Sequence, residues 1–197
     1  MLPAIMNSMT ELCDLAYKYG TDKCPKLGHS YTPVYYKLFK DKRKVFKKVL
    51  ELGIGSAKTM QYVPSHYQLG ASLKMWRDFF PNAQIYGVDR HSSCMFEDKR
   101  ITTVQLDMNW RSSMRSLIEK TGSDIDLLID DGSHKFEAQS YLLKHLLPLV
   151  NKGVIYVIED SKSPDLLKDL AVSLGYRAES ITFSKAHKQD TLVIINK

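Results

Sequence analysis

The sequence predicts an α/β protein whose mostly parallel sheet has helices on both faces. Short apolar runs rich in Val and Ile alternate with longer segments whose apolar residues recur at helical spacing. Some of the short runs, such as residues 127–129 and 154–158, are apolar at every position, which is typical of strands buried on both faces. Acidic residues follow several runs directly, at the end where an open α/β sheet binds its ligands. These features favour a doubly wound sheet of about seven strands.

The strands can be placed one by one from these apolar runs. In chain order they are residues 49–52, 84–88, 102–106, 127–130, 154–158, 178–183 and 191–195. Their alternation with helical segments indicates that most of them pair in parallel. The last two have only a short connection between them, residues 184–190, so we expect an antiparallel hairpin at the end of the sheet.

Six helices are expected from the apolar periodicity. They are residues 10–19, 33–40, 71–80, 111–120, 135–147 and 165–174. Thr32 is a suitable N-cap, with Pro33 at the first helical position. Ser163 and Pro164 give the same signal before the last helix.

Size and composition fit a single domain over residues 1–197, with 44% hydrophobic and 25% charged residues. No apolar run approaches the roughly 20 residues that span a bilayer, and the first residues do not resemble a signal peptide. Cys13, Cys24 and Cys94 lack metal-ligand spacing, so we expect free thiols in a reducing, cytoplasmic environment.

The chain is basic, with a formal net charge of +6 and a pI near 9.1. The lysines are nevertheless scattered, and the densest run, residues 40–48, resembles a solvated helix end before a strand. Aromatic and basic residues do not alternate as they do on single-strand-binding surfaces. The sequence therefore does not favour nucleic acid as a partner.

Residues 126–134 form the most informative stretch. An apolar run ends in two adjacent carboxylates, Asp130 and Asp131, followed by Gly132 and then by His134. Two neighbouring carboxylates are costly to bury together unless a cation or a proton lies between them. The pattern therefore indicates a site at the tip of this strand.

A second acidic pair, Glu159 and Asp160, ends the apolar run at residues 154–158. Side by side, the two strand tips would form an oxygen-rich pocket with His134 at its rim. Carboxylate oxygens are the ligands that hard divalent cations prefer, and an imidazole can act as a general base.

The first three predicted strands also end in acidic or glycine-rich turns. Glu51 lies near the end of the first strand, Gly53 and Gly55 follow it, and Asp89 and Asp107 follow the second and third strands. Acidic residues at such tips commonly bind ribose hydroxyls or face an adenine amine. Each aspartate alone could simply cap the next helix. The series in order favours a nucleotide-type cofactor.

Several further motifs point to one family. The matching pieces are residues 19–23, 29–31, 51–53, 70–76, 80–83, 87–89, 129–134 and 158–160. With these the chain resembles the class I S-adenosylmethionine-dependent methyltransferases, and more closely the macrocin and mycinamicin type, which methylates sugar hydroxyls. The Asp-Asp-Gly-Ser-His and Glu-Asp pieces are specific, whereas Glu-Leu-Gly is shared by many methyltransferases.

The resemblance implies a Rossmann-like fold, S-adenosylmethionine as the methyl donor and a bound magnesium ion. It implies Asp131, Glu159 and Asp160 as metal ligands, and His134 as the base, with Asp131 as the second catalytic residue. The residues expected at the cofactor are Glu51, Gly53, Gly55, Ser72, Asp89, Arg90, Asp107 and Asp130.

Some of these assignments have alternatives. Asp130 could be a metal ligand, or it could serve the cofactor edge or support the loop. Its side chain should point to the opposite face of the strand from Asp131. Glu159 and Asp160 could cap the following helix. His134 could be a structural partner at a helix start.

In one segment the chain departs from the family pattern. Residues 56–69 separate the glycine turn from the next helix, whereas in similar proteins the two almost adjoin. We expect an inserted loop at the ligand edge of the sheet, either covering the site or lying as a plain surface loop. The insertion leaves open whether Gly55 or Gly70 lies closest to the methionine part of the cofactor.

The N-terminal residues 1–45 are expected to form a helical cap over the active site. Tyr31 and His29, together with Tyr67 of the insertion, are the expected acceptor contacts. The alternative is that tyrosines of this segment form the buried face of a helix.

We therefore expect a magnesium-dependent O-methyltransferase that acts on a sugar hydroxyl, such as one of a rhamnose on a glycan or glycoside. A catechol-type or other small-molecule acceptor, a non-catalytic module that binds S-adenosylmethionine or a glycan, and a nucleic-acid methyltransferase are the alternatives. The chain is short for the family that it resembles. It could form a homo-oligomer or be a domain of a larger glycan-assembly protein.

Overall fold

The computed structural model describes residues 9–58, 64–185 and 188–197. Within them the chain forms one mixed sheet of eight strands, in the order β3-β4-β2-β1-β5-β6-β8-β7. The strands are β1 (Lys48–Leu52), β2 (Gln84–Asp89), β3 (Glu97–Asp98), β4 (Ile101–Gln105), β5 (Leu127–Asp130), β6 (Ile155–Glu159), β7 (Arg177–Lys185) and β8 (Lys188–Asn196). The predicted fold class is confirmed, with the two-residue β3 as the additional strand.

The strand order reverses between β1 and β5. From β1 the sheet extends through β2 and β4 on one side and through β5 and β6 on the other, with all of these strands parallel. Open α/β sheets bind ligands beyond the carboxyl ends of the strands at such a reversal. The register places Leu52 beside Asp130 and Asp130 beside Ile158, so the tips of β1, β5 and β6 adjoin.

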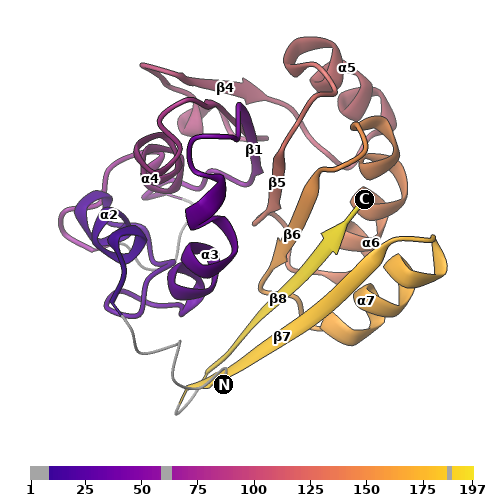
Figure 1. Cartoon of the computed structure of the whole chain (residues 1–197). Helices are drawn as coiled ribbons and strands as arrows, with labels where there is room; N and C mark the ends of the chain where they lie inside the picture. The colour runs from indigo at the N-terminus through magenta and orange to yellow at the C-terminus, as the bar shows by residue number, and fades with distance from the viewer. Residues whose placement is uncertain (1–8, 59–63, 186–187) are drawn as a thin grey trace.

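Helices of the described residues cover both faces of the sheet, three on each, as Figure 1 lets the reader follow. They are α2 (Glu11–Tyr19), α3 (Tyr31–Phe39) and α4 (Ala71–Phe79) on one face, and α5 (Arg111–Thr121), α6 (Phe136–His145) and α7 (Pro164–Ser173) on the other. The N-terminal helices α2 and α3 thus belong to the layer that covers the sheet.

Side chains of the central strands alternate between these two layers. In β5, Leu127 and Ile129 pack in the core beneath α2, α3 and α4, whereas Leu128 packs in the core beneath α5, α6 and α7. The whole strand is buried, as its unbroken apolar sequence predicts. The same alternation decides which layer each strand-tip residue faces.

Helix α3 begins earlier than the sequence predicts. Its N-cap is Ser30 rather than Thr32, so Pro33 lies within the first turn. Thr32 is fully buried, and its hydroxyl oxygen lies 3.1 Å from Sγ of Cys13. The capping prediction was wrong here because this hydroxyl makes its hydrogen bond in the core between α2 and α3.

The C-terminal hairpin is confirmed. β7 pairs antiparallel with β8, and β8 pairs antiparallel with β6. The ladder continues out to Lys185 and Lys188, so most of the connection predicted at residues 184–190 is strand. Ser163 is the N-cap of α7 and Pro164 its first residue, as predicted.

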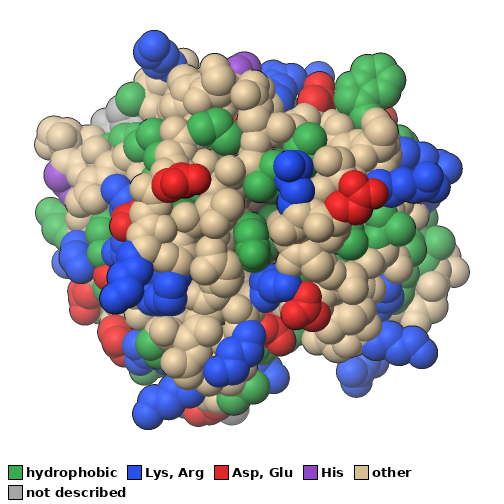
Figure 2. Space-filling model, turned by 90° about the horizontal axis from the view of Figure 1, so that it is seen from above, with side chains coloured by type: hydrophobic (Ala, Val, Ile, Leu, Met, Phe, Trp, Pro, Cys, Tyr) green, Lys and Arg blue, Asp and Glu red, His purple; other side chains and the backbone are tan. Residues whose placement is uncertain are grey.

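The end of the molecule opposite the carboxyl ends of the parallel strands has mixed charge. Figure 2 shows its Lys and Arg side chains dispersed among Asp and Glu. A nucleic-acid backbone is bound by clustered basic residues, which this face does not present among the described residues. Within the part of the chain that the structure describes, no helix has the length and apolar character to cross a bilayer.

Candidate active site

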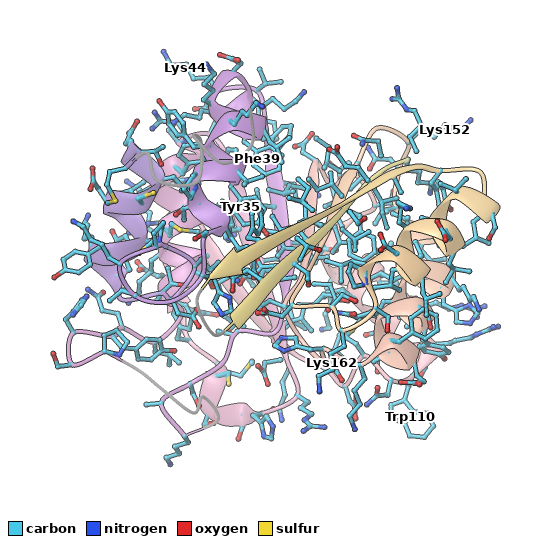
Figure 3. The ribbon with its side chains drawn as sticks, turned by 90° about the horizontal axis from the view of Figure 1, so that it is seen from below. Tyr35, Phe39, Lys44, Trp110, Lys152 and Lys162 are labelled. Carbon is cyan, nitrogen blue, oxygen red and sulfur yellow. The ribbon has the colours of Figure 1, made fainter. Side chains whose placement is uncertain are left out.

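A cavity of about 1670 Å³ opens beyond the carboxyl ends of the parallel strands, the edge that Figure 3 views from below. The segments that follow these strands form its walls. They are residues 52–55, 88–91, 106–110, 130–135 and 159–162. The volume exceeds the roughly 300–1,000 Å³ of a pocket for one drug-sized ligand, so the cavity has room for two ligands.

Three carboxylates meet at the tips of β1, β5 and β6. Glu51 in β1, Glu159 in β6 and Asp131, the residue after β5, face the α2, α3 and α4 layer, and the three strands are neighbours in the sheet. Glu51 is 0% and Glu159 1% exposed. The side chains of Asp131 and Asp160 keep 25% and 16% exposure and line the cavity.

A buried lysine lies between these three carboxylates. Lys23, from the connection between α2 and α3, is 1% exposed. Its Nζ lies 2.5 Å from Asp131 Oδ2, 2.5 Å from Glu159 Oε2 and 3.7 Å from Glu51 Oε1. The strand-tip patterns of the sequence assign Lys23 no role. The available signal was its place in the Tyr-Gly-Thr-Asp-Lys motif at residues 19–23.

The Lys23 ammonium affects the pKa values of the neighbouring carboxylates unequally. Burial alone would lower the pKa of Lys23, but the charges of Asp131, Glu159 and Glu51 outweigh it and raise this pKa well above its ordinary value. Burial would raise the pKa of Asp131, yet Lys23 and the hydrogen bond from His134 lower it to about 2. Burial raises the pKa of Glu159, and Lys23 offsets this only partly. Lys23 therefore stays protonated and is no general base.

Two tyrosines of α3 hold the carboxylates of the β6 tip. Tyr31 OH donates to Asp160 Oδ1 at 2.7 Å, and Tyr35 OH donates to Glu159 Oε1 at 2.5 Å. They lie one turn apart, so they share one helix face; Figure 3 shows Tyr35 in the interior. Tyr31, expected at the acceptor, is fully buried and does not line the cavity. It belongs to the buried face of α3, the alternative that the sequence left open.

His29 ties the connection between α2 and α3 to β8. Its Nδ1 lies 3.0 Å from Asp190 Oδ1 and 3.5 Å from Asp160 Oδ1. The backbone N–H of Ser30 donates to Asp190 Oδ2 at 2.8 Å. His29 stacks on Tyr31 and lines the cavity, where it was expected to meet the acceptor.

His134 lies on the cavity wall with a carboxylate partner. Its Nε2 is 3.3 Å from Asp131 Oδ1, and 41% of its side chain is exposed. The hydrogen bond to Asp131 raises the pKa of His134 above its ordinary value. An imidazole that is oriented by a carboxylate and open to a cavity can accept a proton from a bound hydroxyl.

The site offers a set of donors that fits a hard cation. The donor atoms of Asp131, His134 and Asp160 all lie within 4.8 Å of one another. Asp160 has φ 51°, in the left-handed region that few non-glycine residues adopt, although Asp does so more often than most. Two carboxylates with room for waters suit Mg²⁺. Among the described residues, Glu159 completes no such group, because Lys23 and Tyr35 hold its oxygens.

Asp130 faces the layer opposite to that of Asp131, as expected from strand alternation. It is 0% exposed; its Oδ1 accepts from the Gly132 N–H at 3.2 Å, and its Oδ2 accepts from Tyr156 OH at 3.1 Å. Burial raises the pKa of Asp130 to about 6. These contacts support the turn after β5, one of the roles left open for this residue.

The tips of β1, β2 and β4 line a second region of the cavity. Gly53 and Gly55 have φ +90° and +66°, values that favour glycine. Asp89 Oδ2 accepts from the N–H groups of Ile54 and Gly55 at 3.1 and 3.2 Å, which fixes this glycine turn. Asp107 also lines the cavity, so these predicted cofactor residues adjoin one space.

Of the other expected cofactor residues, some lie on the cavity wall and one lies beneath it. Ser72, in α4, lies on the cavity wall, and Arg90 is an exposed lining residue. Glu51 lies beneath the wall, where its Oε2 accepts from Trp76 Nε1 at 2.7 Å. Burial raises the pKa of Glu51. Its carboxylate thus faces Lys23 and the core.

Part of the insertion, residues 59–63, lies outside the described residues. Of the remainder, Tyr67 lines the cavity, and its hydroxyl donates to the carbonyl of Gly55 at 3.4 Å. Gly70 is the N-cap of α4 and packs against the ring of Phe96. Of the two glycines left open by the sequence, Gly55 is the one on the cavity wall.

Comparison with known proteins supplies the family. No family model matches the chain. The chain is 37% identical over 76% of its length to the mycinamicin VI 2''-O-methyltransferase of Micromonospora griseorubida, and 36% identical over 81% to the demethylmacrocin O-methyltransferase of Streptomyces fradiae. The chain is a homologue of the macrocin-type sugar O-methyltransferases. The matches cover 36% and 38% of those two relatives, so this methyltransferase homologue spans little more than a third of their length.

A solved structure matches nearly the whole methyltransferase homologue. MycE methyltransferase from the mycinamycin biosynthetic pathway, in complex with Mg and SAH, aligns with a TM-score of 0.74 and 29% identity. The alignment covers 96% of this chain and 55% of that chain. The resemblance inferred from the motifs is therefore confirmed, together with the methyltransferase fold.

Proposed function

We propose that the chain is a magnesium-dependent O-methyltransferase that transfers a methyl group from S-adenosylmethionine to a sugar hydroxyl. The observation that carries this proposal is the group formed by Asp131, Asp160 and His134 on the wall of a cavity with room for two ligands. Its homologues are named mycinamicin VI 2''-O-methyltransferase and demethylmacrocin O-methyltransferase. MycE is in complex with Mg and SAH, the demethylated product of S-adenosylmethionine.

The nucleoside donor would occupy the region at the tips of β1, β2 and β4. Gly53 and Gly55 permit close approach to the backbone, and Asp89 and Asp107 offer carboxylates for hydroxyl and amine groups. S-adenosylmethionine, when bound, supplies a methyl group activated by its sulfonium. Most of the rate gain in such a transfer comes from holding donor and acceptor in line.

The carboxylates Asp131, Glu159 and Asp160, here called the acid cluster, would prepare the acceptor hydroxyl for methyl transfer. Asp131 and Asp160, with Glu159 beside them, would hold the metal, and magnesium when bound lowers the pKa of a hydroxyl that it chelates. Asp131 also orients His134 through its Oδ1. The acceptor hydroxyl would give its proton to His134 while its oxygen bonds to the methyl carbon and the carbon–sulfur bond breaks.

For the acceptor we propose a deoxysugar such as rhamnose on a glycoside, because a vicinal diol offers two oxygens to one cation. A relative supports this choice: the chain is 37% identical over 76% of its length to the 8-demethyl-8-(2-methoxy-alpha-L-rhamnosyl)-tetracenomycin-C 3'-O-methyltransferase of Streptomyces olivaceus. A catechol presents a similar diol and is therefore the informative competing acceptor.

The test incubates the protein with S-adenosylmethionine labelled at its methyl group and a panel of rhamnosyl and other deoxysugar glycosides. We expect label on a glycoside, loss of transfer in EDTA and recovery with Mg²⁺. Dihydroxybenzoate serves as the catechol comparison, and calorimetry measures donor binding separately. Absence of donor binding would overturn the proposal. Donor binding without transfer to any glycoside would instead support a binding module.

A further inference from the structure

Lys23 places a fixed positive charge inside the acid cluster. Its side chain is 2% exposed, and its Nζ contacts both Asp131 and Glu159 at 2.5 Å. A buried ammonium is retained only with such partners, because an unpaired buried charge is very costly. The contacts bridge the β5 tip and the β6 tip, so Lys23 holds two strand ends together.

Asp131 also belongs to the group of donors that could hold the metal, and Glu159 lies beside that group. Lys23 uses Asp131 Oδ2 and Glu159 Oε2. Asp131 Oδ1 faces His134, and Asp160 lies close by. A divalent cation at this site would therefore share Asp131 with a neighbouring ammonium.

We propose that Lys23 is a resident counter-ion, which stabilises the metal-free site and keeps its affinity for a divalent cation moderate. The inference rests on the proposed function, since it concerns the same metal site. It makes Lys23 a positioning residue that sets the charge of the site. Two cations that share carboxylates repel each other, so the ammonium weakens metal binding and favours release of the metal.

Charge balance supports this role. Glu51, Asp131 and Glu159 place three carboxylates around one lysine. Without the ammonium, the buried carboxylates at the tips of β1, β5 and β6 would repel one another. The metal-free protein would then lose stability. The affinity of the site for a divalent cation would rise roughly tenfold or more.

The test compares Lys23→Met with the wild type and with Lys152→Met, a control that removes the same charge from an exposed position far from the site (Figure 3). Calorimetric titration with Mg²⁺ and thermal unfolding in EDTA or in excess Mg²⁺ are the measurements. We expect Lys23→Met to melt earlier in EDTA, to bind Mg²⁺ at least tenfold more tightly and to show a larger Mg²⁺-induced shift. Lys152→Met should match the wild type.

The outcomes separate this inference from the proposed function. Wild-type protein that binds neither S-adenosylmethionine nor Mg²⁺ would remove the proposed function itself. If the wild type binds both ligands but Lys23→Met binds Mg²⁺ equally or more weakly, only the role of Lys23 is overturned. If Lys23→Met does not fold in EDTA, Lys23→Gln repeats the comparison. Failure of both variants to fold even in excess Mg²⁺ would also overturn it, because the cation would not replace the ammonium.

Discussion

Two adjacent residues of one strand tip acquire opposite properties. Asp130 and Asp131 are consecutive, yet the pKa of the first rises to about 6 and that of the second falls to about 2. Strand alternation points them to different layers, where Asp130 meets Tyr156 and Asp131 meets Lys23. Burial raises the pKa of Asp130, whereas at Asp131 the ammonium of Lys23 and the hydrogen bond to His134 outweigh burial, so the surroundings in the folded chain set the charge of each carboxylate.

Asp130→Asn should change how stability depends on pH. The folded-state pKa of Asp130 is raised, so the folded protein holds more protons than the unfolded chain between about pH 4 and pH 6, and stability should fall as pH rises through this window. The variant should lack this loss, which is roughly 2–3 kcal/mol for a shift of this size. Urea unfolding at several pH values measures it, with the exposed Asp41→Asn as control. Parallel curves for Asp130→Asn and wild type would contradict the prediction.

His134→Ala should lose methyl transfer but keep donor binding. Removing a general base typically costs 10²- to 10⁴-fold in rate. His134 lies on the wall near Asp131, so calorimetric affinity for S-adenosylmethionine should stay unchanged while turnover falls. His145→Ala, at the C-terminal end of α6 and outside the cavity wall, is the matched control. Equal turnover in both variants would exclude His134 as the base.

At the scale of elements, the turn after β1 packs closely against the tip of β5. Gly53 N–H donates to Val88 O at 2.8 Å, and Asp131 N–H donates to Leu52 O at 2.8 Å. A Cβ on Gly53 would collide with the backbone carbonyl of Asp131. The glycine motif thus serves close packing of two strand tips as well as access to a ligand.

Gly53→Ala should lower the free energy of unfolding by more than backbone strain alone would. Gly153 provides the comparison, because its φ of +92° is close to the +90° of Gly53 and a Cβ at that position would meet no atom within 4 Å. Gly153→Ala should cost about 1–2 kcal/mol from strain. Gly53→Ala should cost more and also weaken Mg²⁺ binding, since Asp131 must move. Chemical unfolding and calorimetry measure both effects; equal losses would show that the close contact is unimportant.

At the scale of the whole molecule, the strand order separates two regions of one cavity. The tips of β1, β2 and β4 form the region proposed for the donor, and the tips of β5 and β6 carry the acid cluster. The hairpin β7–β8 and the connection between α2 and α3 close the acid side, through Asp190 and His29. Donor binding and metal binding should therefore be largely independent.

SAH should bind with similar affinity in EDTA and in Mg²⁺. At a concentration of 100 times its dissociation constant, it should stabilise the fold by about 2.7 kcal/mol in either condition. Asp131→Ala should leave this stabilisation unchanged, because Asp131 belongs to the acid side. Thermal unfolding with SAH gives the comparison. Loss of SAH binding in EDTA would show that the two regions are coupled.

Much of the site was accessible from local sequence patterns. The apolar runs ending in Asp89, Asp107, Asp131 and Glu159 predict parallel strands with acidic tips, and alternation predicts the opposite directions of Asp130 and Asp131. The capping of α3 and the extent of the hairpin were missed. The capping of α3 depends on a contact with another helix, between Thr32 and Cys13, and the hairpin is longer because β7 and β8 stay paired up to Lys185 and Lys188.

The sequence by itself determined the fold class, the family resemblance and the acidic strand tips, because periodicity and turn residues act over a few positions. Only the tertiary structure decided which groups partner those acids. Lys23 reaches Asp131 and Glu159 across 108 and 136 residues, and Tyr35 reaches Glu159 across 124. These pairings depend on how the α2 and α3 layer packs over the sheet. The sequence suggests acidic residues that bind only a metal ion, whereas this packing places the Lys23 ammonium among them.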